Sequence, residues 1–475
     1  MEIDADGVVE FTQALVRIPS TNDPALGRNE DPAALLVAEK MRSWGWEPSI
    51  SYAAPGRPNV VAVVSYGLPG PTLMFEGHTD VVTEGDLSTW TVDPFGGEIR
   101  DGRLWGRGSA DMKSGLAATL YATRALQLAG PFPGRIKVCA LADEEGLMLG
   151  AHHFVSSGLG EDVDGAIVAE PEAGEICAVA KGALRLRVDF AGKMAHGAMP
   201  QHGRNPIQAV GALLEGLRSL QSSLQAAYPA HEHLGEVYVT PTVVQAGTEE
   251  QVNVIPAVAS VFVDVRTIPG VVHKDVAARV LELAAFDGIV AEVTVLVDRP
   301  AVDVPVSDPV VVALAGAHRA VTGEEPVYGG VPGSTDGTIL THWGGIPSVV
   351  YGPGGKWIAH QADEFVEVEE IVRCTRVFAE AARLFLTTPR PAAPDSAIPA
   401  SATPASATPA SATPASATPA SATPASATPA SATPGSATPD SATPDSGASR
   451  DAFSRGGAPR DGASPGGLSH DGAAS

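Results

Sequence analysis

The hydrophobic pattern of residues 1–181 alternates between helical stretches and short apolar runs. Asp31 and Pro32 are typical of a helix start, and a second helix is expected over residues 113–128, ending at Gly130. Extended segments are predicted at residues 59–64, 72–75, 135–141 and 166–169. Because short, nearly continuous apolar strands alternate with helices, we expect an α/β layered domain.

A different order of elements follows over residues 182–298. The pattern predicts a strand, a helix, two strands, a helix and a strand, at residues 184–190, 206–220, 237–245, 257–266, 273–285 and 291–297. This βαββαβ order is that of a ferredoxin-like unit. Since residues 299–390 return to the α/β style, we expect one larger domain made of residues 1–181 and 299–390, with residues 182–298 inserted into it as a second domain.

The end of the chain, residues 391–475, has another composition. Ten five-residue units, mostly ASATP, run from Asp395 to Pro444, and Gly, Ser, Ala, Asp and Arg predominate after them. Such a segment has too few apolar side chains to offset the entropy lost on ordering, so we expect it to be disordered or polyproline-like. A drifting low-complexity extension is the simpler interpretation, and a spacer or docking tail is the alternative.

Composition narrows the class of protein. The formal net charge is −24, which argues against binding to nucleic acid or to an anionic membrane surface. No apolar run approaches the roughly 18 residues of a membrane span, and the acidic start does not resemble a signal peptide. The three cysteines, Cys139, Cys177 and Cys374, are odd in number and widely spaced, which excludes a disulfide framework and suits a reducing cytoplasm.

Polar residues gather where predicted strands end. His78 and Asp80 follow the strand at residues 72–75, and Asp111 precedes the helix at residues 113–128. Two residues apart in an extended chain, His78 and Asp80 face the same way, as a metal-binding imidazole and its supporting carboxylate would. Taken singly, each has a simpler explanation, namely a polar strand end for His78 and a helix N-cap for Asp111.

Three further acids and one histidine also lie just after predicted strands or apolar runs. Glu144 and Glu145 come after the strand at residues 135–141, Glu170 follows residues 166–169, and His360 follows an apolar run at residues 347–351. Solvated turns for the acids, and a surface or core histidine for His360, are the simpler alternatives. However, parallel sheets place their ligand crevice at the carboxyl ends of strands, so these clusters can converge.

Two histidines and three carboxylates form a nitrogen and oxygen ligand set that suits Zn²⁺, Co²⁺ or Mn²⁺. Five ligands exceed the needs of one tetrahedral zinc, whereas two metals that share a carboxylate would use them all. Paired metals about 3.5–4 Å apart are a known means of activating water for hydrolysis.

The ordered motifs GHTDVV, GRGSADMKSG, DEEG, EPE, AHGAMP and AHQADEF resemble the dizinc deacylase and exopeptidase family, which includes acetylornithine deacetylase, succinyl-diaminopimelate desuccinylase and glutamate carboxypeptidase. The resemblance covers residues 5–388. It implies a zinc-exopeptidase-like α/β catalytic domain made of residues 1–181 and 299–390, with residues 182–298 as an inserted ferredoxin-like lid or dimerisation domain. It implies that His78, Asp111 and Glu170 hold one metal, and that His360, Asp111 and Glu145 hold the other, with Asp111 as the bridge.

The resemblance also implies the other roles. Glu144 takes the place of the catalytic acid and base, and Asp80 orients His78. In the inserted domain, His196 matches a histidine that stabilises the oxyanion, often in the partner subunit, so a homodimer is implied. Asn253 and Arg266 match positions that contact the carboxylate side of the substrate.

The resulting prediction is a metallohydrolase with two zinc ions, or cobalt or manganese, that cleaves the amide bond of an N-acyl amino acid. Water is activated at the metals, and Glu144 carries the proton. A metallo-exopeptidase that acts on C-terminal residues or dipeptides is the alternative. A non-catalytic binding protein is a further one, which the presence of Glu144 and all five ligands argues against.

Overall fold

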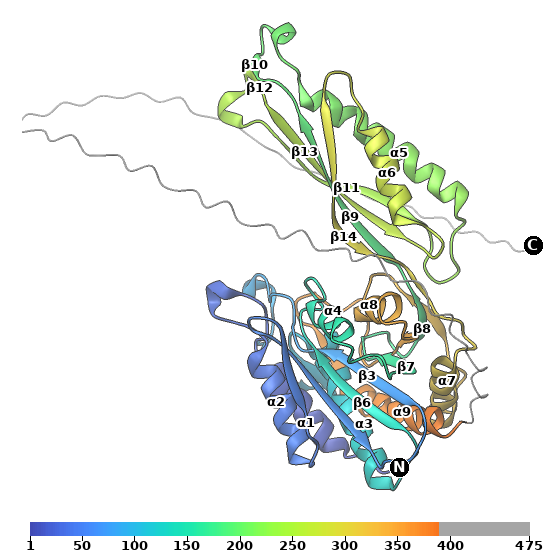
Figure 1. Cartoon of the computed structure of the whole chain (residues 1–475). Helices are drawn as coiled ribbons and strands as arrows, with labels where there is room; N and C mark the ends of the chain where they lie inside the picture. Colours follow the sequence, from blue (N-terminus) through green and yellow to red (C-terminus); the bar gives the residue numbers. More distant parts are fainter. Residues whose placement is uncertain (389–475) are drawn as a thin grey trace, which may run out of the picture. The chain divides into compact units, whose positions relative to one another are not determined.

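The computed structural model describes residues 1–388 (Figure 1). The predicted low-complexity tail therefore lies outside the described residues. None of the helices within residues 1–388 is long and apolar enough to cross a membrane.

A nine-stranded mixed sheet forms the centre of the larger α/β part. Its strand order is β1-β2-β6-β3-β7-β17-β8-β15, with β16 also paired to β8. The strands are β1 (Ser49–Ala54), β2 (Arg57–Ser65), β3 (Thr72–His78), β6 (Arg135–Leu141), β7 (Gly165–Val168), β8 (Ile176–Ala180), β15 (Val302–Asp303), β16 (Tyr328–Val331) and β17 (Ser348–Val350). Four of these strands match the segments that the sequence predicts.

Helices pack around this sheet. Helices α3 and α9 both contact β3, and α1 and α7 pack against this pair, while α4 and α8 contact each other as well as other strands of the sheet. The helices are α1 (Ala5–Val16), α2 (Asp31–Ser43), α3 (Ser114–Ala129), α4 (Leu149–Ser156), α7 (Pro309–Thr322), α8 (Asp336–His342) and α9 (Val368–Thr387). A small sheet of β4 (Glu98–Arg100), β5 (Arg103–Trp105) and β18 (Phe365–Glu367) joins distant segments of the chain.

The middle of the sheet is parallel, and this arrangement positions the site. Strand β3 runs parallel to both β6 and β7, and β7 runs parallel to β17. The carboxyl ends of these four strands therefore meet at one edge, which is where His78, Glu144, Glu170 and the segment before His360 follow in the sequence.

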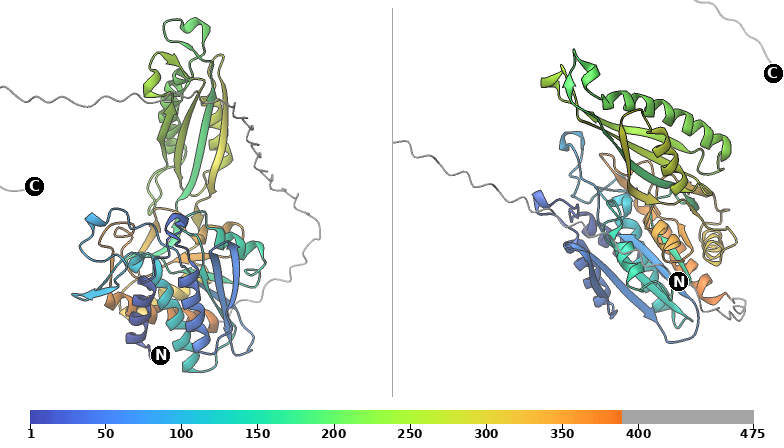
Figure 2. Two further views of the ribbon diagram at one scale, coloured as in Figure 1. Left: turned by 90° about the vertical axis from the view of Figure 1, so that its left-hand side faces the viewer. Right: turned by 45° about the horizontal axis from the view of Figure 1, so that its top comes forward.

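Residues 182–299 form a separate four-stranded antiparallel sheet, ordered β11-β13-β9-β14, with two long helices beside it (Figures 1 and 2). Its elements are β9 (Gly182–Ala191), α5 (Pro206–Ala227), β11 (Tyr238–Ala246), β13 (Val258–Thr267), α6 (His273–Leu283) and β14 (Val290–Arg299). The predicted βαββαβ order is confirmed. The apolar side chains of this sheet and its helices form a second hydrophobic cluster, distinct from that of the nine-stranded sheet. The strands β10 (Ala195–His196) and β12 (Val254–Ile255) form a separate short antiparallel ribbon beside this four-stranded sheet (Figure 1).

One glycine permits a close approach at the site edge. A Cβ atom on Gly115, in the first turn of α3, would lie 1.9 Å from the carbonyl oxygen of Ala169, just beyond β7. Only a residue without a side chain lets α3 start this close to the end of β7.

Candidate metal centre

His78 ends β3 and is fully buried. Its Nδ1 lies 3.0 Å from the backbone oxygen of Asp80 and 3.4 Å from Asp80 Oδ1, while its Nε2 lies 3.1 Å from Asp111 Oδ1 and 3.6 Å from Glu170 Oε1. One ring nitrogen is therefore held by Asp80, and the other faces two carboxylates. This is the usual arrangement of an imidazole that binds a metal.

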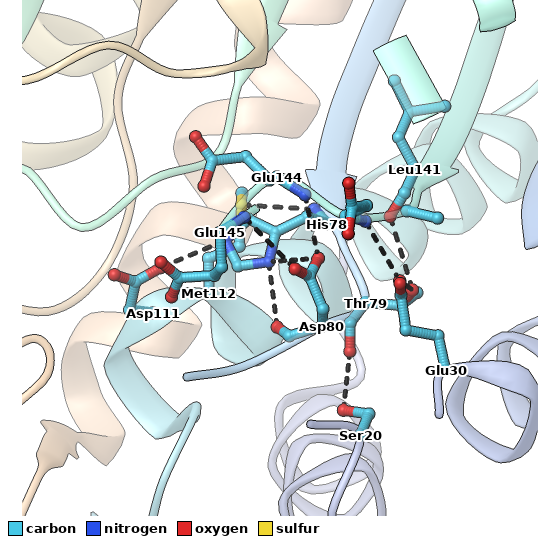
Figure 3. Close-up of polar contacts among 12 residues, drawn as sticks. Ser20, Glu30, His78, Thr79, Asp80, Asp111, Met112, Leu141, Glu144 and Glu145 are labelled. Carbon is cyan, nitrogen blue, oxygen red and sulfur yellow. Dashed lines mark hydrogen bonds and ion pairs between the residues drawn. The ribbon is translucent and has the colours of Figure 1, made fainter. Parts of the chain in front are cut away.

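Asp80 also holds the backbone of the segment that follows the neighbouring strand β6. Its Oδ1 accepts a hydrogen bond from the backbone N–H of Glu144, and its Oδ2 accepts one from that of Glu145, both at 3.1 Å (Figure 3). A single buried carboxylate thus sets the ring of His78 and the backbone of the two acids after β6.

Asp111 lies between the two histidines. Its Oδ1 faces His78, and its Oδ2 lies 3.4 Å from Nε2 of His360, which in turn lies 3.0 Å from Glu145 Oε1. Each oxygen of Asp111 therefore faces a different histidine, as a bridging carboxylate requires. The N-cap of α3 is Lys113 and has no side-chain hydrogen bond, so the helix-cap explanation for Asp111 is wrong.

The backbone around Asp111 is held by Glu364, which the sequence reasoning did not single out. Glu364 is fully buried, and its Oε1 accepts from the backbone N–H groups of Ala110 (3.0 Å) and Asp111 (3.1 Å). Its other oxygen forms an ion pair with Arg107. The only sequence signal was its place in the AHQADEF motif, four residues after His360.

All five predicted ligands lie together, and Glu144 accompanies four of them in one cleft. The cleft is lined by Asp111, Glu144, Glu145, Glu170, Pro171, Glu172, Val331, Pro332, Gly333, Ser334, Thr335, Lys356, Ala359 and His360. His78 forms its buried floor, since its ring contacts Asp111 and Glu170. The first three residues of the segment GSTDG, Gly333, Ser334 and Thr335, also line it.

The buried carboxylates of this cluster carry negative charge that bound cations would neutralise. Burial, together with repulsion among the carboxylates, raises the pKa of Glu144 and Glu170 well above the usual range. Burial alone would lower the pKa of His78, but Glu170, Asp111 and Asp80 raise it well above its usual value. Hydrogen bonds to Asp111 and Glu145 raise the pKa of His360 to about 10. Buried carboxylates in such numbers require paired charge or bound metal, and these nitrogen and oxygen donors fit two divalent cations that share Asp111.

A neighbouring group of acids already has its cation. Oxygens of Glu172 and Glu175 each lie 2.8 Å from the ammonium of Lys356, and Cys177 Sγ donates to Glu172 at 3.2 Å. Burial would lower the pKa of Lys356, but the two carboxylates raise it above its usual value. Sequence reasoning missed this ion cluster, because Lys356 lies 184 and 181 residues along the chain from Glu172 and Glu175 and shares no motif with them.

Three of the predicted site residues lie in the part of the chain that forms the smaller antiparallel sheet. His196 is exposed in β10, where its Nδ1 accepts from the backbone N–H of Ala198 at 3.0 Å, and Asn253 is exposed just before β12. Arg266, in β13, pairs with Asp264 at 2.7 Å. Within residues 1–388, no hydrogen bond or ion pair joins these three to the metal-binding cluster, so their roles stay predictions.

Comparison with known proteins supports the resemblance. The profile of peptidase family M20/M25/M40 matches residues 74–384. Succinyl-diaminopimelate desuccinylases from Methylorubrum extorquens and Methylobacterium radiotolerans are 30% and 31% identical, and each alignment covers 78% of this chain and 96% or 95% of the relative.

Solved structures show the same fold. An M20 family metallo-carboxypeptidase from Sulfolobus solfataricus has a TM-score of 0.65 at 20% identity, over 81% of this chain and 99% of that one. A Bacillus subtilis protein described as a dinuclear metal binding peptidase of family M20 has a TM-score of 0.60 at 19% identity, over 80% and 98%. With its sequence and its fold in agreement, the chain belongs to peptidase family M20/M25/M40 and is a hydrolase that acts on amide bonds.

Proposed function

We propose that this hydrolase cleaves the amide bond of N-acyl amino acids with the help of two divalent metal ions. The observation that carries the proposal is the placement of Asp111, whose two oxygens face His78 and His360 at 3.1 and 3.4 Å. The names of the desuccinylase relatives favour an acylated amino acid over a peptide as the substrate.

The distances support the ligand assignment that the family resemblance implies. His78, Asp111 and Glu170 would hold one metal, and His360, Asp111 and Glu145 the other. The donor set fits zinc, with cobalt and manganese as further candidates. Bound metals would supply a Lewis acid for the substrate carbonyl and lower the pKa of a water molecule.

Side chains of the protein would carry out the proton transfer and keep the metal ligands in place. Glu144 lies in the cleft beside these ligands and would accept a proton from the attacking water, then donate it to the leaving nitrogen. Asp80 would keep His78 in the correct orientation through its contact with Nδ1. Burial raises the pKa of Glu144, which makes its carboxylate a stronger base toward the proton of the attacking water.

For the smaller sheet we propose the roles that the family pattern implies. His196 would stabilise the oxyanion in the partner subunit of a homodimer, and its exposure in β10 is compatible with such reach. Asn253 and Arg266 would contact the carboxylate side of the substrate. We further propose domain limits at residues 1–181, 182–298 and 299–390, which the two hydrophobic clusters support, and a cytoplasmic location, which suits three free buried cysteines.

The proposal is tested by a hydrolysis screen of metal-free protein reloaded with Zn²⁺, Co²⁺ or Mn²⁺. The substrates are N-acetyl and N-succinyl derivatives of several amino acids and a set of dipeptides. We expect metal-dependent release of the amino acid from at least one N-acyl substrate. Hydrolysis of dipeptides alone would replace the proposal with the exopeptidase alternative, and no turnover with any metal would contradict both.

A further inference from the structure

The larger α/β part contains a second cavity, outside the metal-binding cleft. Its volume is about 460 Å³, and none of its lining residues lines the cleft. It lies where the turn between β7 and β8 meets the end of α7, the segment before β16 and helix α9. Its polar lining consists of Glu175, His318, Thr322, Glu324, Glu325 and Arg373.

The lining of this cavity carries negative charge. Three of the six polar side chains are carboxylates, and only Arg373 is a cation. Arg373 pairs with Glu370 at 3.0 Å, and Glu325 pairs with Arg319 at 2.7 Å. Among residues 1–388, by contrast, Glu324 forms no ion pair, and its side chain accepts no hydrogen bond. The cavity therefore offers an uncompensated carboxylate to an occupant.

A buried histidine in the cavity wall has one ring nitrogen without a partner. His318 in α7 is 8% exposed, and its Nδ1 lies 3.1 Å from the hydroxyl of Tyr351. No other hydrogen bond or ion pair within the described part of the chain reaches this ring, so Nε2 is available to an occupant. Burial lowers the pKa of His318 although Glu324 opposes this, so the ring is neutral at pH 7 and can accept a hydrogen bond at Nε2.

This lining suits a small organic cation with N–H donors. An ammonium group can donate to Glu324 and to Nε2 of His318, and each is a strong acceptor for a charged donor. A single metal ion fits less well, because the side-chain groups of residues 1–388 that are close enough to hold one do not include His318 or Glu324. The volume is also that of a site for an organic molecule.

The cavity wall contacts the segment that precedes His360. Three of its side chains reach residues 351–356, either directly or through one neighbour. These contacts are His318 with the hydroxyl of Tyr351 (3.1 Å), Glu175 with Nζ of Lys356 (2.8 Å), and Arg373 through Glu370, which accepts from the backbone N–H of Gly354 (3.1 Å). An occupant that repositions these side chains would therefore shift the segment that carries His360.

We propose that this cavity binds a small molecule with a primary ammonium group and that the occupant alters metal binding at His360. The second half rests on the proposed function, in which His360 is a metal ligand. The nitrogen of an amide is uncharged, whereas the amine released by amide hydrolysis is protonated at neutral pH. The cavity would thus select the amine product over the acylated substrate and make the product an effector of the enzyme.

Calorimetric titration of the metal-loaded full chain with 1,4-diaminobutane and with L-lysine tests the binding. Each probe is compared with its fully acetylated form, whose nitrogens are uncharged. We expect the free amines alone to bind. Tighter binding of the diamine assigns a simple amine as the ligand, and tighter binding of lysine assigns an amino acid, whose carboxylate would pair with Arg373.

Two substitutions remove the proposed acceptors one at a time. Glu324→Gln should raise Kd for the bound amine about 10-fold or more, because it replaces a charged acceptor by a neutral one. His318→Asn keeps a polar group near the hydroxyl of Tyr351 but lacks Nε2, and should also weaken binding. Unchanged Kd in both variants would overturn the inference.

A matched pair of valine substitutions locates the bound amine. Val327 lines the cavity, whereas Val306 lines neither the cavity nor the cleft, and each is 61% exposed. Val327→Trp should fill the cavity and abolish binding, and Val306→Trp should leave Kd unchanged. Binding by Val327→Trp equal to that of the wild type would place the amine elsewhere and overturn the inference. If Val327→Trp does not fold, Glu324→Gln and His318→Asn decide the binding.

Titration with Co²⁺ in the presence and absence of 1,4-diaminobutane tests the coupling. The affinity for one Co²⁺ should change about 5-fold or more in the wild type. It should change less in Val327→Trp, which shows how much the amine acts by binding Co²⁺ itself. Equal changes in both proteins would overturn the coupling. A chain that binds two Co²⁺ but hydrolyses no amide substrate would contradict the proposed function, whereas the calorimetric result still decides whether the cavity binds an amine.

Discussion

At the scale of single residues, the centre depends on side chains that serve two neighbours at once. Asp80 contacts Nδ1 of His78 and accepts from the backbones of Glu144 and Glu145, and Asp111 faces both histidines. Shared groups of this kind couple the positions of all ligands. A change at one of them is therefore expected to affect metal binding and catalysis together.

Adjacent acids with different assigned roles can be separated. Glu144→Gln should reduce kcat by at least about 10²-fold while two metals per chain remain, because Glu144 is assigned to proton transfer and not to metal binding. Glu145→Gln should weaken one metal, since Glu145 Oε1 lies 3.0 Å from His360. Metal analysis and kinetics of both variants check this. Loss of metal in Glu144→Gln with activity retained would reverse the two assignments.

At the scale of elements, an ion cluster ties together the segments that carry His360 and Glu170. Lys356, four residues before His360, pairs with Glu172 and Glu175, which follow Glu170 in the turn between β7 and β8. Lys356→Met would leave Glu172, whose side chain is 3% exposed, without its charge partner. We expect a loss of roughly 1–3 kcal/mol in the free energy of unfolding.

The same variant should also weaken the metal bound by His360, because the segment before this residue loses its anchor. Isothermal titration with Co²⁺ and thermal melting measure the two effects. Lys356→Arg, which keeps the charge, should retain most of both. Unchanged metal affinity in Lys356→Met would show that His360 is positioned independently of this cluster.

The packing of α3 against the end of β7 gives a second prediction at this scale. Gly115→Ala would place a methyl group 1.9 Å from the Ala169 carbonyl oxygen, so the helix or the strand end must shift. We expect destabilisation of about 1–3 kcal/mol or more, with reduced metal binding at Glu170. Denaturant unfolding and metal analysis test it.

Gly211 provides the matched control. It lies on the exposed side of α5, and a Cβ atom there meets nothing within 4 Å. Gly211→Ala should therefore stabilise the protein by up to about 1 kcal/mol through helix propensity alone. Equal effects of the two substitutions would contradict the close-approach argument.

At the scale of the whole molecule, the tail and the body should be separable. Every described site residue and both hydrophobic clusters lie before residue 389. Truncation after Arg390 should leave the melting temperature and the kinetic constants essentially unchanged, since the ASATP repeats carry neither ligands nor a candidate core. A clear drop in either quantity would show that the tail docks on the body.

The assembly proposed for His196 is also testable at this scale. His196→Ala should lower kcat by roughly 10²–10³-fold without loss of metal, as removal of an oxyanion donor does. In a verified heterodimer of His196→Ala and Glu144→Gln subunits, one site would have both groups intact if His196 acts across the interface. The heterodimer is then expected to have about half the activity of a wild-type dimer. No recovery would mean that His196 acts in its own subunit or has no role in catalysis.

The sequence by itself predicted the βαββαβ order of residues 182–298, two helices and four strands of residues 1–181, and the five candidate ligands. Helices and strands follow from local apolar periodicity, and His78, Glu144, Glu145 and Glu170 could be grouped because the ends of parallel strands share one edge. Even the boundaries were close: α3 was expected over residues 113–128 and spans Ser114–Ala129. The longer extent of α5, to Ala227, continues an apolar stripe through Leu224.

Only the tertiary structure decided how these residues are held. The bond from Glu144 to Asp80 spans 64 residues, that from Arg299 to Gly146 spans 153, and that from Asp111 to Glu364 spans 253. Such contacts depend on sheet order, register and loop packing, which local periodicity does not encode. His318 shows this clearly, because its sequence neighbours give no sign of chemistry, whereas its burial and its contact with Tyr351 place it in the wall of a cavity.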